Sequence, residues 1–506
     1  MLSVFDQGPP PPCPAPFNMA AHVLSRAGDH PDKTALSVLG RTQARHWSYA
    51  EVEAAVRGIA TGLLDRGLTP GDIVLLRLGN TPEFPLAYLG AIAAGLVPVP
   101  SSAQLTELET AAIIAELVPA LVLHQPGVPC PDHPARLDVS ALGAMHHLPP
   151  APYHMGDPNR PGYIVYTSGT SGKPRAVLHA HRAIWARQMM MQGWYGLTGQ
   201  DRLLHAGAFN WTYTLGTGVM DPWTMGATAL IPEPGTEPAA LPALLAFHEA
   251  TIFAAAPGVY RKMLMSGNSI DFPRLRHGLA AGEKLSPSLR SMWETATATP
   301  VFEAYGMSEC STFISACPDH PARDGALGQP QRGRRIAILG DAGPVPKGTQ
   351  GVIAVHRDDP GLMLEYLGAP EETQARFQGE WFLTGDQGVM AADDQIHYLG
   401  RADDMMNAGG YRVSPLEVEQ ALAHCPGIEA VGVTDIQVKD DVRIIAAFYT
   451  GSAPIPVATL QAFAARTLAR YKQPREYVYL QDLPTGPNGK LLRRALKTLA
   501  PDVTHG

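Results

Sequence analysis

The sequence of 506 residues is 45% hydrophobic and 17% charged, which excludes a largely disordered chain and a continuous coiled coil. Its 39 basic and 47 acidic residues give a net charge of −8, which argues against a nucleic-acid binder. The longest apolar stretch, residues 88–100, is too short to span a bilayer, and the N-terminus lacks the basic and apolar regions of a secretory signal. The five cysteines are scattered without CxxC spacing, so we expect reduced thiols in a cytoplasmic protein rather than disulfides or a zinc site.

Strand-like and helix-like segments alternate along the chain up to about residue 283. The expected strands are residues 35–40, 72–78, 120–125, 228–233, 251–257 and 275–283. Helical spacing of apolar residues predicts helices between them, at residues 49–67, 84–95 and 241–250. Because such alternation is typical of parallel sheets covered by helices, the sequence predicts an α/β fold.

The pattern of apolar residues and glycines changes after residue 333. Short apolar runs with glycine-rich turns predict a small β-rich region that contains strands at 334–340, 351–357 and 379–386. The tail beyond residue 404 has two helical and two strand-like segments, which predict a separate small α+β domain. We therefore divide the chain into an N-terminal domain of residues 1–402 and a C-terminal domain of residues 403–506.

The segment YIVYTSGTSGKPRAVLHAH (163–181) carries the clearest chemical signal. A strand-like run leads into the loop Thr167, Ser168, Gly169, Thr170, Ser171, Gly172 and Lys173. Glycines let backbone N–H groups approach an anion, hydroxyls add donors and the lysine adds positive charge, so we expect a phosphate-binding loop. It is not a Walker A loop, because only two residues separate Gly169 from Gly172 and Pro174 follows the lysine.

This loop resembles the signature loop of adenylate-forming enzymes, which include acyl-CoA synthetases, adenylation domains of peptide synthetases and firefly luciferase. Further segments match in the family's order: AGEKL (281–285), EAYGMSE (303–309), WFLTGD (381–386), GRADDMMNAGGYRVSPLEVE (400–419) and PTGPNGKLLRRAL (484–496). The resemblance covers about residues 17–498 and is closest to benzoate-type and medium-chain acyl-CoA synthetases. It implies that ATP converts a carboxylic acid to acyl-AMP with release of pyrophosphate, and that coenzyme A then takes the acyl group.

The resemblance also implies roles for single residues. Lys173 and the loop before it would hold the β- and γ-phosphates, Ser308 the α-phosphate and Glu309 a Mg²⁺ ion. Lys490 would bridge the carboxylate and the α-phosphate, and Asp403 would be the hinge about which a mobile C-terminal domain rotates. The other residues expected at the nucleotide or along the thiol tunnel are Gly282, Glu283, Glu303, Ala304, Tyr305, Gly306, Asp386, Arg401, Gly409, Gly410 and Arg412.

The expected acid pocket lies in the segment 205–228. Phe209, Trp211 and Tyr213 predict an apolar, partly aromatic wall, although core packing explains any one of them as well. Asn210 stands where amino-acid-activating relatives usually carry an aspartate, which argues against an α-amino acid. We therefore expect an aromatic or medium-chain acid.

Other functions stay open at this point. The acyl-AMP could pass to the thiol of a separate carrier protein instead of coenzyme A. An ATP-binding regulatory protein without catalysis is a different class, and the presence of both Glu309 and Lys490 argues against it. The motifs do not exclude luciferase-type oxygenation, and they leave the oligomeric state open, with a homodimer as one option.

Overall fold

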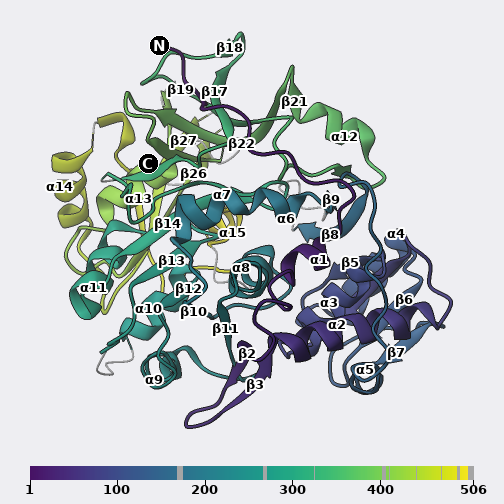
Figure 1. Cartoon of the computed structure of the whole chain (residues 1–506). Coiled ribbons are helices and arrows are strands. Elements are labelled where there is room, and N and C mark those ends of the chain that lie inside the picture. Colours follow the sequence, from purple (N-terminus) through teal and green to yellow (C-terminus); the bar gives the residue numbers. More distant parts are fainter. Residues whose placement is uncertain are drawn as a thin grey trace.

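The structure is a computed structural model of the whole chain (Figure 1). It describes residues 1–167, 175–265, 271–323, 325–401, 406–408, 411–439, 442–468, 470–486 and 491–499.

A large mixed sheet forms the centre of the molecule. Its parallel part runs in the order β2 (Thr34–Leu39), β11 (Thr228–Pro232), β10 (Arg202–His205), β12 (Ile252–Ala255), β13 (His277–Ala281) and β14 (Val301–Met307). The strand β3 (Ala44–Ser48) pairs antiparallel with β2 at one end. At the other end the sheet continues antiparallel through β15 (Ser311–Ser315), β16 (Ala326–Pro330), β23 (Ile396–Arg401), β22 (Trp381–Met390), β19 (Gln350–His356), β17 (Arg335–Gly340) and β1 (Val4–Asp6). The expected α/β class and the β-rich region after residue 333 are both confirmed.

A second, fully parallel sheet has the order β5 (Val97–Pro100), β4 (Ile73–Arg77), β6 (Leu121–His124) and β7 (Arg136–Asp138). The helices α2 (Tyr49–Leu64) and α3 (Glu83–Ala93) pack on each other beside these strands (Figure 1). Helix α2 begins at a capping box, in which the Ser48 side chain accepts from the Glu51 N–H and the Glu51 side chain accepts from the Ser48 N–H. Its apolar stripe and that of α3 belong to one hydrophobic core.

A third, small sheet frames the expected phosphate loop. Strands β8 (Pro161–Thr167) and β9 (Arg175–Ala180) form an antiparallel hairpin on either side of it, and β20 (Glu365–Tyr366) pairs with β9. The loop thus joins two paired strands, in contrast to the strand-to-helix loop of a Walker A site.

Helices cover the parallel part of the large sheet. Helix α9 (Leu241–Phe247), helix α10 (Pro257–Met265) and helix α11 (Pro287–Thr297) pack around Trp293, which stacks against Phe253. The π-helix η2 (Tyr213–Met220) leads into α8 (Asp221–Met225) and contacts β10 and β11.

Two elements around η2 are joined by a buried ion pair. The Arg187 guanidinium, which follows α6 (Ala183–Ala186), donates from Nε and Nη2 to the two carboxylate oxygens of Asp221 at 2.8 and 2.6 Å. A Cβ at Gly216 would lie 2.4 Å from this guanidinium, so only glycine fits there.

The described residues after 405 have their own hydrophobic clusters. These form between the strands β26 (Ala430–Lys439), β27 (Val442–Thr450) and β28 (Glu476–Tyr479) and the helices α13 (Pro415–Leu422), α14 (Val457–Thr467) and α15 (Arg493–Thr498). The short strands β24 (Met406–Ala408) and β25 (Tyr411–Val413) pair with each other. All other clusters contain only residues before 399, and the domain boundary expected at residue 402 stays a prediction. No helix within the described ranges is both long and apolar enough to cross a membrane.

Candidate active site

The residues expected at the nucleotide gather at the carboxyl ends of parallel strands. Strand β13 ends at Ala281, directly before Gly282, and β14 ends at Met307, directly before Ser308 and Glu309. Strand β10 ends at His205 and leads to the segment expected to bind the acid. In open parallel sheets this edge is the usual position of a ligand site.

Two segments far apart in sequence meet at Asp386. The Tyr305 hydroxyl donates to Asp386 Oδ2, and the Tyr398 hydroxyl lies 3.4 Å from Oδ1. The pairing of β22 with β23 places Arg401 opposite Asp386, and its Nη1 lies 3.4 Å from Oδ1. The structure therefore brings together the residues expected at the adenine and the ribose. Tyr398 was not among the expected residues.

Close packing of β14 against β15 explains Gly306. The register between the two strands shifts after Tyr305, and a Cβ at Gly306 would lie 2.0 Å from the Ser311 carbonyl oxygen. Glycine is therefore required for this approach. Ala304, one residue before Tyr305, is buried in the core below.

Glu309 is 9% exposed and is held in place by a neighbouring segment. The Tyr366 hydroxyl donates to Glu309 Oε1 at 2.6 Å, and the Met363 N–H donates to the Glu309 carbonyl at 2.7 Å. Burial and the nearby carboxylate raise the pKa of Tyr366 far above its usual value, so the phenol stays a donor. No signal in the sequence singled out Tyr366.

This arrangement fits a Mg²⁺ ion that is shared with substrate phosphates. Magnesium prefers oxygen ligands and is usually held by one or two carboxylates plus phosphate oxygens and water. Glu309 supplies one such carboxylate, and the described part of the chain has no group of three or more His, Cys, Asp or Glu side chains that could form a metal cage.

The segment that holds Glu309 also contacts the strand after the phosphate loop. Helix α12 (Pro370–Ala375) carries Glu372, whose carboxylate accepts from Arg175 Nε and Nη2 at 2.6 and 2.5 Å. The Thr373 hydroxyl accepts from the Tyr366 N–H at 2.9 Å. One short segment thus braces both the loop end and the carboxylate expected to bind the metal.

Glu303 fixes the turn after β13 through hydrogen bonds to two residues of that turn. This buried carboxylate accepts from Lys284 Nζ at 3.0 Å and from the Leu285 N–H at 2.9 Å. The contacts position the turn that carries Gly282 and Glu283, so an effect of Glu303 on a nucleotide would pass through this turn.

The four residues expected at the acid pocket differ in position. Phe209 is only 1% exposed and packs on Phe84 in the core, with ring centroids 5.8 Å apart. The Tyr213 hydroxyl donates to the Leu279 carbonyl at 3.0 Å, beneath the sheet edge. Asn210 and Trp211 are half-buried, and the Trp211 ring lies 3.9 Å from the position of a Cβ at Gly282. Of the four, Trp211 thus lies directly beside the expected nucleotide turn.

His179 connects the β8–β9 hairpin to Ser308. Its Nε2–H donates to the Ser308 carbonyl at 2.7 Å, and its ring stacks on Tyr163 with centroids 4.8 Å apart. Burial lowers the pKa of His179 to about 4, so the ring is neutral near pH 7. His179 and His181 are both buried.

Several expected site residues lie outside the described residues: Ser168, Gly169, Thr170, Ser171, Gly172, Lys173, Asp403, Gly409, Gly410 and Lys490. For Thr167 and Arg412 only the backbone is described, in β8 and β25.

Comparison with known proteins decides the family. The model of the AMP-binding enzyme family matches residues 24–367, and that of the AMP-binding enzyme C-terminal domain matches residues 417–490. The chain belongs to the AMP-binding enzyme family. This confirms the expected adenylate-forming superfamily.

Relatives of this family resemble the chain over nearly its full length. Two human relatives are each 28% identical to this chain over 96% of its length. They are acyl-coenzyme A synthetase ACSM3, mitochondrial, of which 90% is covered, and acyl-coenzyme A synthetase ACSM2B, mitochondrial, of which 91% is covered. A benzoate CoA ligase from Burkholderia xenovorans LB400 is 26% identical with a TM-score of 0.84, covering 95% of this chain and 100% of that one. ATP-bound MatB from Rhodopseudomonas palustris, at 24% identity and a TM-score of 0.87, covers 95% of this chain and 98% of its own and has the same fold.

Proposed function

We propose that this AMP-binding enzyme is an ATP-dependent acid–CoA ligase. In the first half-reaction a carboxylate oxygen attacks the α-phosphorus of ATP, the bond to the β-phosphate breaks, and pyrophosphate leaves. In the second, the thiol of coenzyme A attacks the acyl carbonyl, loses its proton, and AMP leaves. The observation that carries the proposal is the meeting of Tyr305, Asp386 and Arg401 at the sheet edge where Ser308 and Glu309 follow β14.

Each residue at this edge has a proposed task. Tyr305 would flank the adenine and Asp386 would accept hydrogen bonds from the ribose hydroxyls, in exchange for its present contact with the tyrosine. Ser308 would bond the α-phosphate, and Glu309 would hold Mg²⁺, which neutralises charge on the phosphates when bound. Lys173 and Lys490 would balance charge on the transferring group, and Asp403 would be the hinge between the half-reactions.

The acid is proposed to be aromatic or of medium chain length. Trp211 supports this proposal because its half-buried ring stands beside Gly282. The benzoate CoA ligase among the similar structures supports the aromatic part of this range, because benzoate is an aromatic acid. A cytoplasmic location and a homodimer remain expectations; the two human relatives carry the word mitochondrial in their names.

A panel of carboxylic acids scored by pyrophosphate release, with and without coenzyme A, tests the proposal. We expect pyrophosphate release with ATP, Mg²⁺ and a suitable acid, and a thioester once coenzyme A is added. If a carrier-protein thiol accelerates turnover while coenzyme A never does, the alternative acceptor is correct. Binding of ATP without pyrophosphate release from any acid would instead favour a regulatory protein.

A further inference from the structure

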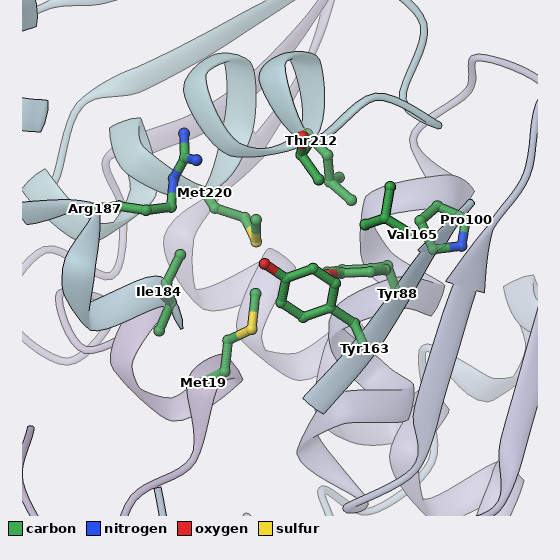
Figure 2. A pocket seen from close by; sticks show the side chains of 10 residues that line it. Met19, Tyr88, Pro100, Tyr163, Val165, Ile184, Arg187, Thr212 and Met220 are labelled. Atoms are coloured by element: carbon green, nitrogen blue, oxygen red, sulfur yellow. The ribbon is translucent and has the colours of Figure 1, made fainter. Parts of the chain in front are cut away.

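A small cavity lies next to Thr212, which follows Trp211 of the proposed acid site in the chain. It is bounded by α1 (Met19–Val23), α3, β5, β8 and η2, and Figure 2 shows its lining side chains. Its volume of about 10 Å³ is the space for one water molecule. Met19 and Met220 form part of the wall, and such flexible thioether side chains can move aside for a larger group.

Two tyrosines bring unpartnered hydroxyl groups to this cavity. Tyr88 is 1% and Tyr163 is 9% exposed, and their rings contact each other at 6.0 Å between centroids. The hydroxyl of Tyr163 points into the space between the labelled side chains (Figure 2). Among the described residues neither hydroxyl has a hydrogen-bond partner. Buried hydroxyls are normally paired, so these two can bond to a group that the described part of the chain does not supply.

The cavity is connected to the proposed site by direct contacts. The Tyr163 ring stacks on His179, whose Nε2–H is bonded to the Ser308 carbonyl. On the opposite wall, Thr212 follows Trp211 in the chain. The cavity thus shares a wall with the segment that carries Trp211, the residue proposed to contact the acid.

The charges around the cavity favour a neutral group. Arg187 is the charged residue on the wall, and its guanidinium is neutralised by the two oxygens of Asp221. Its Nη1 also donates to the Ser311 hydroxyl at 2.7 Å. A second carboxylate in this space would be a buried charge without a counter-ion, which is strongly unfavourable.

We propose that the cavity takes a neutral oxygen, such as a hydroxyl or ether, at the far end of the acid, and that Tyr88 and Tyr163 hydrogen-bond to it. This inference rests on the proposed function and narrows its substrates to monocarboxylic acids with a distal oxygen. In the free enzyme, one water molecule would occupy the same position.

Matched acids test this inference. Phenylpropanoate is compared with its para-hydroxy derivative, and hexanoate with its terminal hydroxy derivative and with adipate. We expect the hydroxylated acid of at least one pair to have a kcat/KM higher by roughly fivefold to tenfold, the worth of one hydrogen bond. Adipate should give no measurable turnover.

Tyr163→Phe should remove that preference by lowering the kcat/KM of the hydroxylated acid to that of the unsubstituted acid measured with the same variant. Its Tm should not decrease, since the lost hydroxyl bonds to no residue in the described ranges. The matched control is Tyr479→Phe, whose hydroxyl donates to the Gly451 carbonyl at 3.0 Å, and it should keep the preference.

Two results would overturn the inference without affecting the proposed function. One is pyrophosphate release from unsubstituted acids with no preference for either hydroxylated acid in the wild type. The other is a Tyr163→Phe variant that loses turnover of both members of a pair equally. If no acid releases pyrophosphate, the proposed function itself fails.

Discussion

The hydrogen bond between Tyr366 and Glu309 leads to a specific prediction about how tightly the enzyme binds Mg²⁺. Its O···O distance of 2.6 Å is typical of a hydroxyl that donates to a charged carboxylate. The bond fixes Oε1 and leaves Oε2 for a cation. Tyr366→Phe keeps the ring and removes only the donor, so Glu309 would be free to turn away from its orientation for the metal.

The size of the effect follows from the kind of bond. Hydrogen bonds to charged groups contribute about 1.5–3 kcal/mol. If about half of this is needed to hold the carboxylate in the orientation that binds metal, the Mg²⁺ concentration at half-maximal rate should rise by about tenfold, because about 1.4 kcal/mol corresponds to one factor of ten. The rate at saturating Mg²⁺ should stay within about threefold of the wild type, since Glu309 itself is unchanged.

The assay is pyrophosphate release at saturating ATP and acid while Mg²⁺ is varied. A second measurement is the increase in Tm caused by ATP with and without Mg²⁺, which reports metal binding without turnover. Tyr153→Phe is the matched control, because Tyr153 donates to Glu53 at 3.1 Å in a pair remote from the site. An unchanged Mg²⁺ midpoint in both measurements would refute the orienting role of Tyr366.

Replacement of Asp221 by asparagine leaves the Arg187 guanidinium buried without a counter-charge, so urea denaturation should show a loss of about 3–5 kcal/mol; a loss below about 1 kcal/mol would contradict this. Burial lowers the pKa of His205 to about 3 from 6.5, so the unfolded chain binds the extra proton, and the free energy of unfolding should fall as the pH decreases from 7 to 5. His205→Gln should reduce this slope. Lys490→Ala should slow acid-dependent pyrophosphate release by roughly 10²–10³ and still convert supplied acyl-AMP and coenzyme A to thioester; equal loss of both steps would argue against a domain rotation.

The sequence predicted part of the parallel sheets because the periodicity of those elements is local, whereas the strands β5, β7, β10 and β14 were missed. The helix expected at residues 49–67 is observed as Tyr49–Leu64, and the strand expected at 72–78 as Ile73–Arg77. The π-helix η2 was missed, since its glycine-rich sequence has no regular apolar spacing. This π-helix is favoured by a tertiary contact, because Gly216 leaves room for the Arg187 guanidinium.

Residues of the candidate site could be predicted from the sequence only where they belong to a recognisable motif. Tyr305 and Asp386 lie 81 residues apart, yet the motif order placed both at the nucleotide, and the structure brings them into contact. The sequence analysis did not identify Tyr366 and Tyr398 as site residues, because an isolated tyrosine is more often a packing residue. Only the pairing of strands in the structure reveals their partners. Phe209 shows the reverse case, since a residue chosen by its position in a motif packs in the core.

The lack of a side chain at position 216 has a consequence for redesign of the enzyme. Any side chain there would meet the guanidinium that neutralises Asp221, so a substitution at this position would have to displace the buried ion pair. Libraries that aim to change acid preference should therefore leave position 216 fixed and vary Trp211, Thr212 and Leu215. Substitutions at these positions would change the shape of the space beside the proposed acid site and would leave the ion pair of Arg187 and Asp221 intact.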